Sequence, residues 1–243
     1  MPVRIVTDSS ADLAADVVER LGIEVVPLSI RFGDEEYTDG VDLSVSQFYD
    51  KLASSADLPE TAAPSPGAFE AAFRRQADAG ADAIVCINLS SGLSATLQSA
   101  QNAASAVEGL DVRVVDSRSI TSGLGTEVRL AAEAAADGAG ADDVVALVDD
   151  LVGRTHVFGA LDTLDNLKKG GRIGGAQALL GSLLSVKPLL DLSSGEVAER
   201  SDDRSLHTTA SAPASVCRRN AASKAPGAGA AVSGRSSDDA NLS

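Results

Sequence analysis

The sequence is poor in aromatic residues and in cysteine. Phe, Trp and Tyr make up 3% of its 243 residues, with no tryptophan, so the core must be built mainly from aliphatic side chains. The two cysteines, Cys86 and Cys217, provide neither a metal-ligand spacing nor a disulfide framework. Cys86 stands inside an apolar run, where a cysteine usually serves as a small hydrophobic residue.

Positive charge is also scarce. Twenty Lys and Arg residues face 35 Asp and Glu residues, which gives a formal net charge of −15 at pH 7. A general nucleic-acid binder needs a basic face to neutralise phosphates, and adhesion to anionic lipid needs one too. We therefore expect no nucleic-acid partner.

Long apolar runs and cofactor motifs are missing as well. No stretch is long enough to span a membrane, and the N-terminus leads straight into an expected strand, without a signal-peptide pattern. We expect a cytoplasmic protein without integral membrane association. No glycine-rich dinucleotide motif or P-loop stands between a strand and a helix. Asp8, Asp116 and Asp191 each end an expected strand, but no ligand spacing connects them, so we expect no metal and no cofactor.

Short aliphatic runs alternate with amphipathic stretches over the first 190 residues. This alternation predicts an α/β fold with a parallel sheet. We expect strands over residues 3–6, 23–30, 83–87, 112–115, 155–161 and 187–191. We expect helices over residues 12–21, 44–52, 68–79, 93–104, 121–137, 142–152 and 176–186. Residues 31–40 are expected to form an edge strand or a hairpin arm, and residues 57–67 a proline-rich ordered loop.

The most informative stretch is residues 82–100, in which a buried strand runs into a Ser/Gly turn and then into a helix. At such a junction the free backbone N–H groups and the helix dipole favour an anion. The hydroxyls of Ser90, Ser91 and Ser94 are available there, and open α/β sheets bind ligands at the carboxyl ends of their strands. The same serines could equally serve only to cap the helix.

Two other polar stretches have the same two interpretations. Ser9 and Ser10 follow the first strand, where they could bind a ligand or cap a helix, and Asp8 could be satisfied by backbone N–H groups. Thr61 lies between two prolines, which restrict its flanks and could hold its hydroxyl in place, although it could also be a plain loop residue.

A basic cluster formed by Lys168, Lys169 and Arg172 stands out in this acidic chain. It could hold a phosphate or contact a protein partner, or it could be a solvated turn near a helix end. From about Arg200 the sequence has almost no large aliphatic residues and no periodicity, so we expect a disordered tail. Its Ser/Ala/Arg/Pro bias also suggests the hypothesis of a frameshift that replaced a C-terminal portion.

The ordered part resembles the DegV family of fatty-acid-binding proteins. The resemblance spans essentially residues 3–198 and lies in the run and order of several motifs. They are VRIVTDSSADL (3–13), IEVVPLSIRFGDEEYTDGVDL (23–43), LPETAAPSPGAF (58–69), INLSSGLSATLQSA (87–100), VRVVDSRSITSGLG (112–125), LDTLDNLKKGGRIGG (161–175) and SVKPLL (185–190).

The resemblance implies a two-domain α/β protein that encloses a long-chain fatty acid in an apolar tunnel and is not itself an enzyme. The family positions that hold the carboxylate correspond to Thr61 and Ser94, with Ser91, Ser9 and Ser10 as further candidates. Some bacterial relatives present the fatty acid to a fatty acid kinase, and Lys168, Lys169 and Arg172 are then candidate partner contacts. The expected domains are residues 1–160 for the head-group domain, 161–198 for the remnant of a smaller, incomplete second domain, and 199–243 for the tail.

The sequence departs from the family pattern at three places. Ala62 and Ala63 replace the Ser and Gln that usually follow the threonine, and Ala95 stands where the family commonly has Gly. The basic segment expected beyond Lys187 and Pro188 is replaced by Glu199–Arg204.

Two alternatives to the fatty-acid carrier stay open. Residues 92–96 nearly match the nucleophile elbow of serine hydrolases, with Ser94 as nucleophile and His156 or His207 as base. The altered C-terminus also fits a truncated family member without function, in which exposed apolar surface would favour aggregation.

Overall fold

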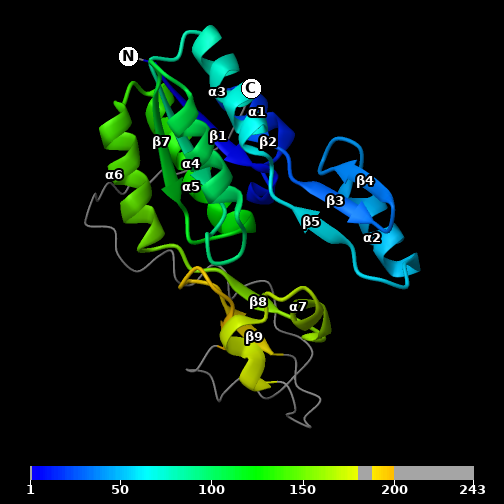
Figure 1. The fold of residues 1–243 in the computed structure, drawn as a ribbon. Coiled ribbons are helices and arrows are strands. Elements are labelled where there is room, and N and C mark those ends of the chain that lie inside the picture. The colour runs from blue at the N-terminus through cyan, green and yellow to red at the C-terminus, as the bar shows by residue number, and fades with distance from the viewer. Residues whose placement is uncertain (1, 180–187, 200–243) are drawn as a thin grey trace, which may run out of the picture. The chain divides into compact units, whose positions relative to one another are not determined.

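The computed structural model describes residues 2–179 and 188–199. Within these residues the strands form three sheets, and the main one has four parallel strands in the order β2-β1-β6-β7 (Figure 1). The bounds of its strands are β1 Val3–Asp8, β2 Glu24–Val26, β6 Ala83–Asn88 and β7 Asp111–Asp116. The α/β fold with a parallel sheet is therefore confirmed.

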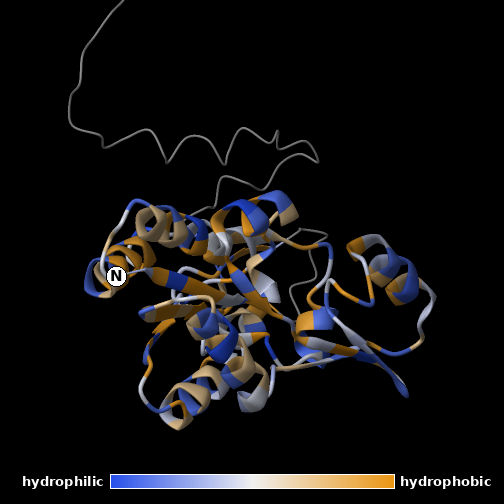
Figure 2. Cartoon of the chain, turned by 90° about the horizontal axis from the view of Figure 1, so that it is seen from above, coloured by the Kyte–Doolittle hydropathy of each residue, from blue (hydrophilic) through white to orange (hydrophobic). Residues whose placement is uncertain are grey.

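Helices cover both faces of the main sheet. The first face packs against α1 (Ala15–Leu21), α5 (Thr121–Ala136) and α6 (Ala141–Val152), and the second against α3 (Pro66–Asp78) and α4 (Thr96–Ala106). All six residues of β6 are buried, as expected for a central parallel strand with helices on both sides. Figure 2 shows apolar residues on the strands and on the helix faces turned toward them.

The strand order places a topological switch point between β1 and β6. From β1 the chain passes through α1 to β2 on one side, and from β6 it passes through α4 to β7 on the other. The two helices lie on opposite faces of the sheet, so the turns after β1 and β6 diverge. Ligands of open α/β sheets bind in the crevice at such a point.

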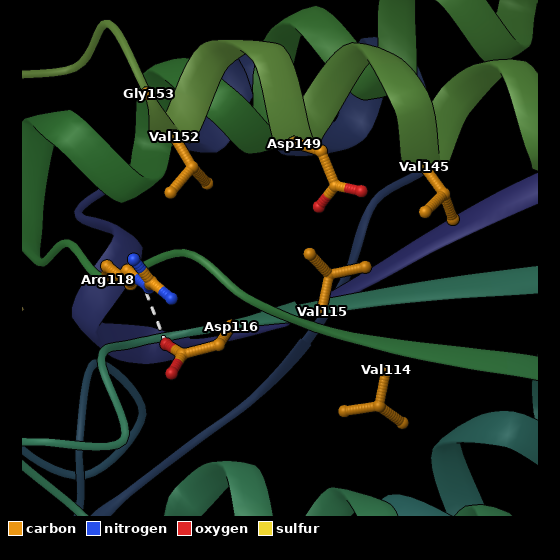
Figure 3. A pocket seen from close by; sticks show the side chains of 8 residues that line it. All are labelled: Val114, Val115, Asp116, Arg118, Val145, Asp149, Val152 and Gly153. Atoms are coloured by element: carbon orange, nitrogen blue, oxygen red, sulfur yellow. Dashed lines mark hydrogen bonds between the residues drawn. The ribbon is translucent and has the colours of Figure 1, made fainter.

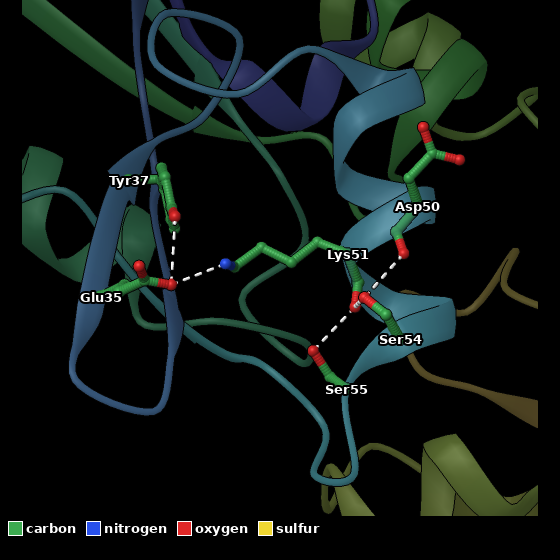
Figure 4. A network of polar contacts seen from close by, with 6 residues as sticks. All are labelled: Glu35, Tyr37, Asp50, Lys51, Ser54 and Ser55. Atoms are coloured by element: carbon green, nitrogen blue, oxygen red, sulfur yellow. Dashed lines mark hydrogen bonds and ion pairs between the residues drawn. The ribbon is translucent and has the colours of Figure 1, made fainter.

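A second sheet, in the order β4-β3-β5, carries a small core of its own. It consists of β3 (Ser29–Phe32), β4 (Glu35–Thr38) and β5 (Glu60–Ala62), and packs against α2 (Val45–Ser54). The Lys51 ammonium lies 2.6 Å from the Glu35 carboxylate, which also accepts a hydrogen bond from Tyr37 at 3.3 Å (Figure 4). This network connects α2 to the β3–β4 hairpin.

The third sheet, in the order β10-β9-β8, contains β8 (Phe158–Ala160), β9 (Leu189–Asp191) and β10 (Ala198–Glu199). It lies with α7 (Asp165–Lys169) and the 3₁₀-helix η2 (Gly174–Leu179) around a core of Leu164, Ala176, Leu190 and Val197. Leu93, from the turn after β6, packs against this core and against the core of the main sheet. None of the described helices is long and apolar enough to cross a membrane.

Several predicted elements need correction. The expected strand over residues 23–30 is two strands in different sheets, because Pro27 lacks the N–H that a continuous ladder requires. The helix expected over residues 12–21 begins at Ala15, after the 3₁₀-turn η1 (Ser9–Ala11). The helix expected from Leu93 begins at Thr96, because the amides of Leu93 and Ser94 donate to the carbonyl of Ser90 in a turn.

Other differences concern residues 57–67 and the second half of the chain. The expected proline-rich loop contains β5, and the strand expected over 155–161 shortens to β8. The helix expected over residues 176–186 is described only as far as Leu179, where it is a 3₁₀-helix. Residues 180–187 and the expected tail beyond Glu199 lie outside the described residues. Residues 31–40, expected to form an edge strand or a hairpin arm, contain β4, which pairs with β3 as a hairpin at the edge of its sheet. The helix expected over residues 44–52 is confirmed as α2, with Ser44 as its N-cap.

Candidate functional site

The buried carboxylate of Asp8 joins the carboxyl ends of β1 and β6. Its Oδ2 accepts hydrogen bonds from the Leu89 amide at 2.9 Å and from the Asn88 side chain at 3.1 Å, and its Oδ1 accepts one from the Ser10 amide at 3.1 Å. Two of these three donors are backbone N–H groups, as the structural interpretation of Asp8 predicts. Asp8 therefore fixes the two turns that border the switch point.

Ser94 lies at the beginning of α4, within the turn that follows β6. Its amide donates to the carbonyl of Ser90 at 3.2 Å, while its half-buried hydroxyl lies 2.9 Å from the hydroxyl of Thr96 and accepts from the Thr96 amide at 3.3 Å. Ala95, the N-cap residue, gives the helix no side-chain cap. The amides of Leu97 and Gln98, in the first helical turn, have no partner within the helix by geometry. A hydroxyl donor and helix amides therefore converge where an anion could bind.

The other candidate serines have partners within the chain. The Ser91 hydroxyl donates to the Asp116 carboxylate, the Ser9 hydroxyl accepts from the Leu28 amide at 3.1 Å, and the Ser10 hydroxyl donates to Asp8. These contacts favour the structural interpretation for Ser9, Ser10 and Ser91. A ligand role for any of them stays a prediction.

Thr61 lies on β5, an exposed strand that pairs with β3. Its backbone is in register with Ile30, and its side chain is exposed. Among the described residues its hydroxyl makes no hydrogen bond, and no hydrogen bond connects it to Ser94. The hydroxyl is thus available to a ligand, whereas its approach to Ser94 stays a prediction.

One member of the basic cluster reaches the serine turn, which is residues 89–95 between β6 and α4. The guanidinium of Arg172 donates to the carbonyl of Leu93 at 3.4 Å and to the carbonyl of Gly170 at 2.7 Å. Lys168 and Lys169 are exposed in the last turn of α7. Arg172 thus adds a positive charge next to Ser94, a contact that sequence spacing did not indicate.

A second neighbour of the turn was also missed. The hydroxyl of Ser90 donates to the carbonyl of Gly195, in the turn between β9 and β10. A Cβ on Gly92 would lie 2.7 Å from this same carbonyl oxygen, so the close approach requires glycine at position 92. The sequence offers only Gly195 as a turn signal, and nothing in it connects this residue to Ser90. The β9–β10 turn therefore supports the serine turn from the side of the third sheet.

The described contacts do not give Ser94 a histidine partner. The Nδ1 atom of His156 lies 3.0 Å from the Ser193 hydroxyl oxygen, and the His156 ring stacks on Phe158 with 6.3 Å between the ring centroids. His207 lies outside the described residues. A hydrolase needs a base within hydrogen-bond reach of its nucleophile, so the arrangement of His156 does not favour this alternative.

One further side chain of the main sheet, Cys86, and the question of a metal site remain. Burial raises the pKa of the Cys86 thiol well above its usual value, as does the nearby charge of Asp8, so Cys86 is an unreactive core residue, as predicted. No group of three or more His, Cys, Asp or Glu side chains within the described ranges could hold a metal ion.

Comparison with known proteins connects this geometry to a family. Residues 2–241 match the family described as "Uncharacterised protein, DegV family". A DegV domain-containing protein of Streptomyces coelicolor is 42% identical over 195 residues, which cover 80% of this chain and 69% of that protein. One from Listeria monocytogenes is 36% identical over the same shares of the two chains.

Solved structures extend the comparison. The structure of a fatty-acid-binding DegV family protein from Thermus thermophilus has a TM-score of 0.76 and 39% identity, and covers 82% of this chain and 71% of its own. DegV of Bacillus subtilis, described as a fatty acid binding protein, has a TM-score of 0.74 and 32% identity, with 84% and 73% covered. The family match over residues 2–241 and the identity to these relatives show that the chain belongs to the DegV family.

Proposed function

We propose that the protein binds one long-chain fatty acid, such as palmitate, and that the hydroxyls of Ser94 and Thr61 hold its carboxylate. The observation that carries the proposal is the Ser94 hydroxyl at the uncapped N-terminus of α4 in a chain whose solved relatives bind fatty acids. We propose further that it acts in the cytoplasm, in fatty acid transport or metabolism, and has no catalytic activity of its own.

The energetics of such a ligand fit the groups that are present. Each buried methylene stabilises the complex by about 0.8 kcal/mol, so a long acyl chain needs no strong ion pair for tight binding. The carboxylate itself must keep hydrogen bonds when it leaves water. Ser94, the first amides of α4 and Thr61 can donate them, and the Arg172 guanidinium at Leu93 adds a favourable charge.

The basic cluster suggests what happens to the bound lipid. We propose that a fatty acid kinase docks at Lys168, Lys169 and Arg172 and transfers the γ-phosphoryl group of ATP to the carboxylate, which forms an acyl phosphate and releases ADP. The lysines are exposed on α7, and Arg172, close to them in the sequence, donates to the carbonyl of Leu93 in the serine turn, which supports a partner surface near the proposed carboxylate site. A basic cluster in a chain of net negative charge would also orient a partner by charge.

The test of lipid binding is mass spectrometry of lipid extracted from the purified full-length chain. We expect a near-stoichiometric long-chain fatty acid in the unmodified protein and its loss in the double variant Ser94→Ala, Thr61→Val. Ser105→Ala is the matched control, because Ser105 is an exposed serine of the same helix whose hydroxyl bonds only to the Gln101 carbonyl. Equal lipid occupancy in the folded double variant would refute the assignment of these two residues.

The kinase proposal has a separate test. Acyl phosphate formation by a bacterial fatty acid kinase is measured with the lipid-loaded chain and with Lys168→Glu, Lys169→Glu. We expect the double charge reversal to slow the reaction at least about tenfold while lipid occupancy stays the same, because charges at a docking surface govern the rate at which the two proteins associate. An unchanged rate would remove these lysines from the partner surface.

A further inference from the structure

A pocket lies between α6 and β7, and its lining residue Asp116 connects it to the serine turn through hydrogen bonds from Ser91. It has a volume of about 570 Å³, within the range of small-molecule sites. Among the described strands β7 pairs only with β6, so it forms an edge of the main sheet. The pocket is lined by Val114, Val115, Asp116, Arg118, Val145, Asp149, Val152 and Gly153.

The lining combines an apolar wall with three charged side chains, Arg118 and the carboxylates of Asp116 and Asp149. Figure 3 shows Val145, Asp149 and Val152 pointing from α6 toward β7, with the Arg118 guanidinium in the same space. Valines from both elements form the apolar part, and Arg118 and Asp149 contribute a positive and a negative charge. A ligand there would meet aliphatic surface along one part and ionic groups along another.

Arg118 and Asp149 are both uncommitted, in contrast to Asp116. The Asp116 carboxylate accepts hydrogen bonds from the amide and the hydroxyl of Ser91 and, at 3.0 Å, from the amide of Arg118. Across the part of the chain that the structure describes, the Arg118 guanidinium and the Asp149 carboxylate make no hydrogen bond or ion pair with protein atoms. One cation and one anion of the pocket are therefore available to a ligand.

The backbone at Arg118 is constrained as well. Its φ of 49° lies in the left-handed region, which a residue with a Cβ rarely adopts. A Cβ built on Gly195 would lie 3.2 Å from the Cβ of Arg118, so the β9–β10 turn packs closely on this residue. Such strained residues persist where their surroundings hold them, and they often occur at ligand sites.

We propose that this pocket binds a free α-amino acid with a branched aliphatic side chain, with L-leucine as the representative. Its carboxylate would pair with Arg118 and its ammonium group with Asp149, while its side chain would contact the valines. A ligand with a carboxylate alone would bring a negative charge close to Asp149, and a ligand with an amine alone would bring a positive charge close to Arg118. A ligand without net charge is also not repelled by a chain of formal charge −15.

The experiment titrates the full-length chain with three probes that differ in charge, followed by calorimetry or ligand-observed NMR. L-leucine is compared with 4-methylpentanoate, which lacks the ammonium group, and with 3-methylbutylamine, which lacks the carboxylate. We expect saturable binding of L-leucine, and binding at least about tenfold weaker for each analogue, because each loses one charged hydrogen-bonded pair. Absence of saturable L-leucine binding, or equal binding of 4-methylpentanoate, would overturn the proposal.

Variants assign the binding to this pocket. We expect Arg118→Gln and Asp149→Asn each to weaken L-leucine binding at least about tenfold. The matched controls Arg154→Gln and Asp150→Asn make the same charge changes on exposed residues that pair with each other and do not line the pocket, so they should leave binding unchanged. Circular dichroism confirms that each variant is folded. Retained affinity in both pocket variants, or equal loss in the controls, would contradict the assignment.

Discussion

Gly195, which packs against the serine turn, combines a positive φ with close neighbours. Its φ is +88°, and an added Cβ would lie 2.8 Å from the Ser90 hydroxyl and 3.2 Å from the Cβ of Arg118. We predict that Gly195→Ala lowers the free energy of unfolding by about 1–3 kcal/mol, because it strains the backbone and disturbs the hydrogen bond from Ser90 to the Gly195 carbonyl. Urea unfolding measures the difference. Gly159→Ala, at a glycine with no positive φ and open space around it, should cost much less, and equal losses would contradict the steric argument.

Glu127 buries a carboxyl group on α5 in the core. Neither of its oxygens has a hydrogen-bond partner among the described residues. Burial, and after it the nearby charge of Asp116, raises its pKa from 4.5 to about 7. Because the folded state holds this proton more tightly than the unfolded chain does, the contribution to stability is full below pH 4.5 and is lost as the pH rises through about 7.

We predict that replacement of Glu127 by glutamine removes this part of the pH dependence. Between about pH 4.5 and pH 7, the free energy of unfolding of the unmodified chain should fall by up to about 3 kcal/mol, and that of Glu127→Gln should not show this fall. Urea unfolding of both proteins at several pH values gives the comparison. Glu133→Gln, on the same helix at a residue paired with Arg129, serves as control. Identical pH profiles of the unmodified chain and Glu127→Gln would show that Glu127 does not titrate in this range.

Helix α2 depends on its cap more than the helices of the main sheet do, since its core is small. The Ser44 hydroxyl accepts from the Gln47 amide at 3.4 Å, and the Gln47 side chain accepts from the Ser44 amide at 2.9 Å. We predict that Ser44→Ala destabilises α2 by about 1 kcal/mol, because it breaks this capping box. Hydrogen exchange should then accelerate at the amides of α2 and not at β6. Ser46→Ala, an exposed position inside the helix, should leave exchange unchanged, and faster exchange there would contradict the role of the cap.

At the scale of elements, the sequence predicted best what local pattern determines. The aliphatic run from Ala83 to Ile87 gave β6 within one residue, and Ser44 marked the start of α2, because burial and capping act over a few neighbours. The strand around Thr61 was missed because its pairing with β3 joins residues far apart in the chain. The break at Pro27 could have been predicted, since proline interrupts a ladder, but the aliphatic run on both sides concealed it.

For the molecule as a whole, the order of motifs indicated the family and the alternation of elements indicated the fold, and both are confirmed. The surroundings of the candidate site could not be predicted in the same way. Arg172 reaches Leu93 across 79 residues, and Ser90 reaches Gly195 across 105. No periodicity specifies such contacts, because they depend on how two sheets with separate cores meet at one turn. Sequence could therefore indicate Ser94 as a candidate, while its neighbours needed the structure.

These contacts give the proposed ligand an effect on the stability of the whole chain. The serine turn touches the core of the main sheet through Leu93, and it also meets Arg172 and the β9–β10 turn. A fatty acid bound at Ser94 should therefore stabilise the main sheet and the third sheet together. The gain is about 2.7 kcal/mol at a free fatty acid concentration one hundred times the dissociation constant. We predict that removal of lipid with an organic or hydrophobic matrix lowers the melting temperature.

Added palmitate should restore the melting temperature of the stripped chain, and it should fail to do so in the double variant Ser94→Ala, Thr61→Val. Differential scanning fluorimetry of the lipid-bearing, stripped and reloaded proteins measures both effects, with Ser105→Ala as the variant that should respond like the unmodified chain. The comparison separates two failures. A stripped chain that melts at the same temperature and takes up no palmitate would contradict fatty acid binding itself. Restoration in the double variant would leave binding intact and would instead contradict the two hydroxyls, since a ligand can stabilise the folded chain only through groups that contact it there.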